Sequence, residues 1–255
     1  MTDDTHRTPP SLMLVFAHPD DESFATGGVA ALASDRGIPV RLVTATAGDA
    51  GRDGGLASTA DGLAAVRTAE LERACALLGI REHVVLGYGD GRLAEAPFED
   101  AVARVCALVR EWRPSVVVTF GREGAGNSHR DHRTICRIAT AAVLAAGDPL
   151  AYPKQRGGSL APHAVAKLYV VSAKPGVLSR DGDPFETPTT RVDVSAVRTR
   201  KLAAFAVHAS QASLVEKLEE WMDANGNAEF FARVLCRVPV PTGLETDLFS
   251  GLEDD

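Results

Sequence analysis

Short apolar segments alternate with longer amphipathic ones along this chain, and the alternation strongly limits the folds it can adopt. The apolar segments have the length of β-strands, and the stretches between them carry apolar residues at helical spacing. Strands that alternate with helices form parallel sheets that the helices cover on both faces. We therefore predict an α/β fold with a mostly parallel central sheet. The expected strands are residues 12–16, 40–45, 84–86, 115–120 and 167–172.

The expected helices lie between and after these strands. They cover residues 27–36, about 59–78, 98–112, 129–146, 195–208 and about 214–224. Gly37 and Gly79 are suited to end the first two, since glycine readily adopts the left-handed conformation of a helix C-terminus. Residues 147–162 and 174–190 are expected to be connections. With no internal repeat or evident linker, we expect one domain over residues 1–255, with residues 1–10 flexible.

Composition excludes several classes of function. The formal net charge is −7 and the basic residues are dispersed, which argues against a nucleic-acid or membrane partner. The apolar runs are far shorter than the roughly 20 residues that span a bilayer, and residues 1–10 lack an apolar signal segment. Cys75, Cys106, Cys136 and Cys236 are scattered, so we expect reduced core cysteines in a cytoplasmic protein.

A crowded polar segment, Ala17-His18-Pro19-Asp20-Asp21-Glu22, directly follows the apolar run of residues 12–16. Ligands of open α/β sheets bind at this edge, outside the carboxyl ends of the strands. Pro19 favours an extended backbone before it, so we expect a loop here and a helix only from Gly27. Ionisable groups this close together are unfavourable unless a positive charge joins them, and a divalent metal ion is the simplest candidate.

A second polar cluster, His129-Arg130-Asp131-His132, follows the expected fourth strand. In a parallel sheet both clusters would lie at the same edge. Catalytic zinc sites use three nitrogen or oxygen ligands from the protein and one water molecule. His18, Asp21 and His132 would form such a set, although either cluster alone could equally be a solvated loop.

The two remaining carboxylates of these clusters suggest further roles. Asp20 would lie beside the metal without binding it, which suits a general base; it could also cap a helix. Asp131 would orient one of the histidines by accepting its second ring N–H. Alternatively, Asp131 is an acid at a helix N-terminus, where it interacts favourably with the helix dipole.

Together these residues resemble the LmbE/PIG-L family of zinc-dependent de-N-acetylases. The resemblance covers residues 12 to about 146, with a weaker similarity in His208-Ala209-Ser210-Gln211. It implies a Rossmann-like sheet with helices on both faces, in which the part from about residue 147 completes the substrate cleft. It further implies one Zn²⁺ per chain and an N-acetylglucosamine-type substrate or its conjugate. Iron or another divalent ion is left open.

The resemblance also implies roles for individual residues. His18, Asp21 and His132 match the zinc ligands, and Asp20 matches the general base. His129 matches the histidine that stabilises the oxyanion, in protonated form, with Asp131 beside it. In the same way, Arg67 and Asp90 match positions that contact the sugar. Arg67 and Glu70 could equally be an exposed pair on a helix, and Asp90 a turn residue.

Some positions depart from the family pattern. Arg130 stands where many members have proline, and Asp49 where glutamate is common. Asn127 occupies the place of a tyrosine in the mycothiol-type enzymes, which argues against that substrate. For His208 we expect a buried core position and no catalytic role.

We therefore predict a hydrolase that releases acetate from an N-acetylated amino sugar. A zinc amidase for a non-sugar conjugate is one alternative. A non-catalytic nucleotide-binding module is another, based on the glycine-rich residues 48–55 and 121–126, although neither has the Gly-x-Gly-x-x-Gly pattern. The expected partner is a small molecule, and association with further copies of the chain is left open.

Overall fold

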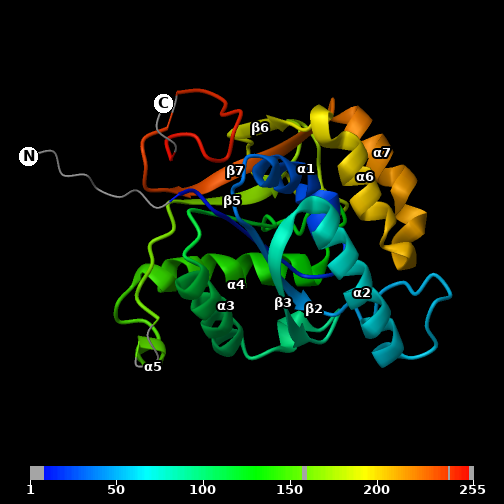
Figure 1. Cartoon of the computed structure of the whole chain (residues 1–255), viewed down its shortest axis with the longest axis horizontal. Coiled ribbons are helices and arrows are strands. Elements are labelled where there is room, and N and C mark those ends of the chain that lie inside the picture. The colour runs from blue at the N-terminus through cyan, green and yellow to red at the C-terminus, as the bar shows by residue number, and fades with distance from the viewer. Residues whose placement is uncertain (1–8, 157–159, 241, 253–255) are drawn as a thin grey trace, which may run out of the picture.

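A seven-stranded sheet forms the centre of the computed structural model, which describes residues 9–156, 160–240 and 242–252 (Figure 1). The strand order is β3-β2-β1-β4-β5-β7-β6. The strands are β1 (Leu12–Phe16), β2 (Val40–Thr46), β3 (Ile80–Tyr88), β4 (Val116–Thr119), β5 (Lys167–Ser172), β6 (Thr190–Asp193) and β7 (Ala228–Cys236). Most of the expected flexible segment, residues 1–8, lies outside the described residues.

The first five strands are parallel, as predicted from the alternation of strands and helices. β1 lies between β2 and β4, with Leu14 opposite both Leu42 and Val118. Every residue of β1 is buried, because helices cover both faces of the sheet. β7 alone reverses direction, and it pairs antiparallel with both β5 and β6.

The helices form one layer on each face. On one face, α1 (Asp21–Asp35) packs on β1, β2 and β7 and contacts α2 (Ala60–Leu78) and α6 (Arg198–Ala206). On the other, α4 (Arg130–Gly147) packs on β1, β4 and β5 and contacts α3 (Phe98–Trp112), as Figure 1 shows. The remaining helices are α5 (Pro153–Arg156), α7 (Val215–Ala224) and the 3₁₀ turns η1 (Leu93–Glu95), η2 (Ser195–Val197) and η3 (Ala209–Leu214). Within the described ranges, no helix has both the length and the apolarity to cross a membrane.

Helix α1 begins earlier than the sequence predicted, at Asp21 instead of Gly27. Pro19 restricts only the residue before it, so the chain is free to enter a helix two residues later. Asp21 and Glu22 then occupy the first turn, where negative charge interacts favourably with the helix dipole. The metal-ligand candidate Asp21 therefore lies on a helix, not on a loop.

The carboxyl-terminal third differs most from the prediction. β6 and β7 were missed, and the helix expected over residues 195–208 ends at Ala206. The first five residues of β7 are all buried, so the strand lacks a clear alternation of polar and apolar residues. The prediction of four core cysteines is wrong for Cys236, which is exposed at the end of β7; the other three are buried.

Glu245 anchors the carboxyl-terminal segment to the buried sheet. Its carboxylate accepts hydrogen bonds from Lys167 Nζ at 2.8 Å, and from the hydroxyls of Tyr169 and Thr190 at 2.9 Å each. Arg233 pairs with the same carboxylate. Lys167 and Glu245 both have fully buried side chains, so the Lys167 charge depends on Glu245 for compensation.

We expect Glu245→Gln to lower the free energy of unfolding by about 3–5 kcal/mol, because it leaves the buried Lys167 charge without its counter-ion. Chemical denaturation monitored by circular dichroism measures the change. Glu95→Gln, which removes the exposed Arg92 pair, is the control, with an expected loss below about 1 kcal/mol. Equal losses in the two variants would show that the buried pair is not a major source of stability.

Candidate active site

The predicted site residues come from segments far apart in the sequence and meet at one edge of the sheet. His18 follows β1, Asp90 follows β3, and His129 and His132 lie where the loop after β4 enters α4. These segments border a cavity of about 920 Å³. Of the predicted residues, the cavity is lined by His18, Asp20, Asp21, Arg67, Asp90, His129 and His132. Asp131 lies behind them, fully buried.

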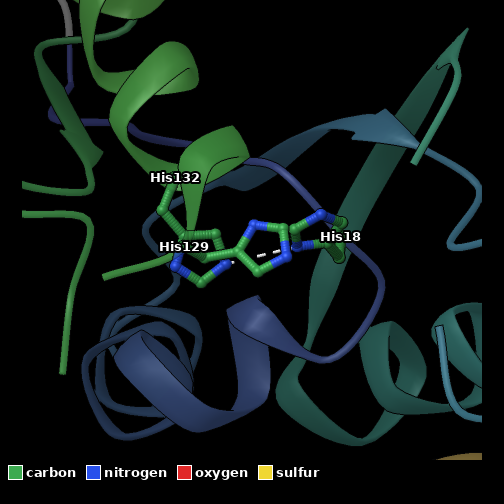
Figure 2. A group of neighbouring side chains, drawn as sticks. All are labelled: His18, His129 and His132. Carbon is green, nitrogen blue, oxygen red and sulfur yellow. Dashed lines mark hydrogen bonds between the residues drawn. The ribbon is translucent and has the colours of Figure 1, made fainter. Parts of the chain in front are cut away.

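The three candidate metal ligands converge on one point, and Figure 2 shows the two histidines among them, His18 and His132, facing each other. His18 Nδ1 lies 3.2 Å from His132 Nε2. Asp21 Oδ2 lies 3.5 Å from His18 Nδ1, and Asp21 Oδ1 lies 3.3 Å from His132 Nε2. Ligand atoms about 2.0–2.2 Å from a tetrahedral zinc ion are about 3.3–3.6 Å apart. The spacing of these donor atoms therefore fits a bound ion of this size.

The outward-facing nitrogens of the two histidines have their own partners. His132 Nδ1 lies 3.2 Å from the Gly124 carbonyl oxygen, and His18 Nε2 lies 3.0 Å from Asp90 Oδ1. If these nitrogens donate, His18 Nδ1 and His132 Nε2 face each other with lone pairs. Two lone pairs at 3.2 Å repel unless a proton or a cation lies between them, which again fits a metal ion.

The charges around His18 also favour a cation. Burial alone would lower the pKa of His18, but Asp131, Asp21 and Asp90 together raise it well above its usual value. The imidazole is thus surrounded by three carboxylates, of which Asp90 also lies 3.9 Å from Arg67 Nη1. A divalent ion would supply the positive charge that these buried carboxylates require.

Asp20 has an unusual backbone conformation beside the ligands. Its φ is 113° and its ψ is −28°, a region that costs a non-glycine residue about 1–3 kcal/mol. Its N–H donates to Glu22 Oε2 at 2.9 Å, and Arg67 donates to the carbonyl of the preceding Pro19 at 2.5 Å. Burial and the Asp21 charge raise the pKa of Asp20 to about 6. These contacts hold its carboxylate at the cavity wall.

Arg67 and Asp90 are buried among the site residues. Arg67 Nη1 donates to the Gly48 carbonyl, and its Nη2 lies 3.5 Å from Asp20 Oδ2. Asp90 orients His18 and accepts the Ala50 N–H at 3.2 Å. The alternative of an exposed Arg67–Glu70 helix pair is wrong, since both side chains are buried. Contact of Arg67 or Asp90 with a sugar stays a prediction.

The histidine that the Asp131 carboxylate approaches is His18, and not His129 as the resemblance implied. That carboxylate accepts the backbone N–H groups of Gly91 and Leu93, at 2.7 and 3.2 Å, and lies 3.4 Å from His18 Nε2. His129 Nδ1 instead accepts the backbone N–H of Asp131. Burial and the His18 and His132 rings lower the pKa of His129, and the opposing effect of Asp131 is smaller.

Two further residues connect the site to the carboxyl-terminal part. His208 Nε2 lies 2.8 Å from Glu22 Oε1, and both side chains are fully buried. Glu22 also holds the N–H of Asp20. The expectation of a buried histidine is thus confirmed, but the role of Glu22 was missed. In the sequence, the one indication of a role for Glu22 was its position in the same polar segment as His18 and Asp21.

Comparison with known proteins identifies a matching family model and similar sequences. Residues 13–143 match the family model PIG-L, described as GlcNAc-PI de-N-acetylase. The chain is 32% identical to the 1D-myo-inositol 2-acetamido-2-deoxy-alpha-D-glucopyranoside deacetylase of Acidothermus cellulolyticus, covering 95% of each chain. It is 33% identical to a deacetylase of the same name from Saccharopolyspora erythraea, covering 97% of this chain and 96% of that one.

Solved structures share the fold. The N,N'-diacetylchitobiose deacetylase of Pyrococcus horikoshii aligns with a TM-score of 0.73 and 25% identity, over 88% of this chain and 83% of that one. The 4-carboxy-2-hydroxymuconate hydratase of Pseudomonas putida also aligns with a TM-score of 0.73, over 92% of this chain and 100% of that one. At 20% identity, this second likeness bears on the fold alone.

We expect His132→Ala to lose its divalent metal on dialysis, because only two of the three converging donors remain. Asp90→Asn is expected to weaken metal affinity by about 10–100-fold, since the amide no longer fixes the His18 ring as a carboxylate does. Metal content after dialysis, by mass spectrometry, measures both effects. His83→Ala, which removes a histidine of β3 outside the cluster, is the control. Stoichiometric metal in a folded His132→Ala protein would exclude His132 as a ligand.

Proposed function

This chain belongs to the PIG-L family of GlcNAc-PI de-N-acetylases, and we propose that it hydrolyses the acetamide of an N-acetylglucosamine conjugate. The products are acetate and the free amino sugar. The observation that carries the proposal is the convergence of His18, Asp21 and His132 on one point, with the Asp20 carboxylate beside them. Three donors with an adjacent unbound carboxylate form the arrangement expected of a metal-dependent hydrolase.

We propose zinc as the metal, because two imidazole nitrogens and one carboxylate are ligands that catalytic zinc sites use. Such an ion, when bound, would polarise the acetyl carbonyl and make a water molecule more acidic. A hydrogen bond from His18 Nε2–H to Asp90 would keep the His18 ring in the correct orientation. The backbone N–H groups of Ala17 and His18, at 3.2 and 2.8 Å from Asp21 Oδ2, would do the same for Asp21.

Asp20 is the proposed general base. Its carboxylate takes a proton from the attacking water and delivers it to the departing amine nitrogen, so it ends the cycle as it began. Glu22 and Arg67 bind the N–H and the C=O of the Pro19–Asp20 peptide bond, which limits the directions that the carboxylate can take.

His129 is the proposed oxyanion donor. Because its Nδ1 accepts the Asp131 N–H, a neutral ring carries its proton on Nε2. That N–H can donate to the oxygen on which negative charge develops in the transition state. The proposed donor is therefore a neutral imidazole, in contrast to the protonated one expected from the resemblance.

The nucleotide-binding alternative loses its main support. A Cβ atom at Gly48 or Gly51 would collide with the Arg67 guanidinium, so this glycine-rich loop makes room for Arg67. The relatives named for an acetamido sugar favour a sugar substrate over a non-sugar amide. Three buried, unpaired cysteines support a reducing compartment, and we propose the cytoplasm.

We expect Asp20→Asn to retain its metal and lose about 10²–10⁴-fold in kcat, because an amide cannot accept a proton from water. Release of free amine from N-acetylglucosamine conjugates gives the rate, and metal analysis confirms loading. Asp61→Asn, an acid in the first turn of α2, is the control and should keep full activity. Near-normal kcat in metal-loaded Asp20→Asn would reject Asp20 as the base.

A further inference from the structure

The cavity extends from the metal ligands into a largely apolar region that the proposed chemistry does not require, where the charged lining residues Lys201 and Glu229 bond to each other. Asp21 and Phe24 lie three residues apart in α1, so they lie near one another on the same helix. The Phe24 ring is 5.6 Å from the Phe205 ring, and both line the cavity. We define the apolar arm as the cavity-lining residues Phe24, Phe185, Phe205, Leu214, Trp221 and Phe230.

Aromatic side chains are concentrated in this cavity. The chain has nine phenylalanines and two tryptophans, and five of these phenylalanines and one tryptophan line it. Phe24, Phe185 and Trp221 are partly exposed, so their rings are open to a ligand. Aromatic rings bind other rings by offset stacking or edge-to-face contact, in addition to the burial of apolar area.

The apolar arm is a poor match for an inositol ring. The relatives reported above are named for an inositol glycoside, and inositol carries a hydroxyl on every carbon atom. A hydroxyl buried against phenylalanine or tryptophan loses its hydrogen bonds to water and gains none. The same walls favour a ligand with an apolar ring.

Basic residues lie beside the apolar arm. Lys217 lies on α7 between Leu214 and Trp221, three and four residues from them, and lines the cavity with both. Arg52 also lines it and donates to Ser213 Oγ at 2.8 Å, next to Leu214. Both basic side chains are exposed. They would attract an anionic group at this end of the cavity.

We propose that the substrate of this enzyme is an N-acetylglucosaminide whose aglycone is an aromatic ring with an acidic substituent. The inference rests on the proposed function for the sugar end and adds the chemistry of the group attached to it. The ring lies in the apolar arm against Trp221 and Phe24, two of the partly exposed aromatic side chains that line it. The acidic substituent lies near Lys217 and Arg52.

Binding to metal-loaded Asp20→Asn, measured by calorimetry, tests the apolar arm separately from turnover. The ligands are the phenyl, 4-carboxyphenyl, octyl and inositol glycosides of N-acetylglucosamine, together with N-octanoylglucosamine. We expect 4-carboxyphenyl to bind about 10- to 100-fold more tightly than the inositol glycoside, because a ring is removed from water. The octyl glycoside and N-octanoylglucosamine are expected to bind more weakly than 4-carboxyphenyl.

Two substitutions in the same background separate the ring from the charge. Trp221→Ala is expected to weaken binding of both aryl glycosides about tenfold. Lys217→Gln is expected to remove the advantage of 4-carboxyphenyl over phenyl, an advantage of about 2- to 5-fold that added salt also reduces. Leu144 is an exposed apolar residue of α4, and Leu144→Ala is the control. It should change neither the ratio of aryl to inositol glycoside affinity nor the ratio of 4-carboxyphenyl to phenyl affinity. If Trp221→Ala does not fold, Phe185→Ala takes its place.

The proposal is overturned if the inositol glycoside binds as tightly as the aryl glycosides, or if the ratios do not respond to the Trp221 and Lys217 substitutions. N-octanoylglucosamine that binds more tightly than the 4-carboxyphenyl glycoside would overturn the proposal, because it would place an acyl chain in the apolar arm. An octyl glycoside that binds more tightly than the 4-carboxyphenyl glycoside would overturn it as well, because it would place an alkyl chain there. Wild-type enzyme that binds aryl glycosides but releases no amine from any ligand would reject the proposed function and leave the binding result standing.

Discussion

The parallel pairing of β1 with β4 is the contact on which the active site depends. Leu12 lies opposite Val116, and Leu14 opposite Val118, so both strands end at the same edge. The chain therefore delivers His18 and His132, 114 residues apart in sequence, to within 3.2 Å of each other. Neither histidine could form a metal site alone, and only the sheet brings them together.

Much of this arrangement could be predicted from the sequence, because its causes are local. The buried strand before His18 and the helical pattern after His132 place both histidines at strand-to-helix connections, where a parallel sheet brings such connections to one edge. The helices α2, α3, α4 and α7 lie close to their predicted ranges for the same reason. Their apolar residues repeat at helical spacing within a single segment.

The errors concern features set by distant contacts. The direction of the Asp131 carboxylate depends on the N–H groups of Gly91 and Leu93, about 40 residues earlier. β7 is placed by pairing with β5 and β6, and Glu229 among its five buried residues interrupts the apolar pattern of a buried strand. The function of Glu22 depends on His208, which lies 186 residues further along. No local pattern encodes these partnerships.

The bond between Glu22 and His208 has a consequence for how the site forms during folding. All three converging donors lie within the first 132 residues, yet the Glu22 side chain that fixes Asp20 reaches a segment after α6. During synthesis, His18, Asp21 and His132 therefore emerge from the ribosome well before His208 does. Assembly of the proposed metal ligands and alignment of the proposed base, Asp20, are thus separable in time, and a nascent chain that holds the three ligands would still lack the Glu22–His208 bond that completes the support of Asp20.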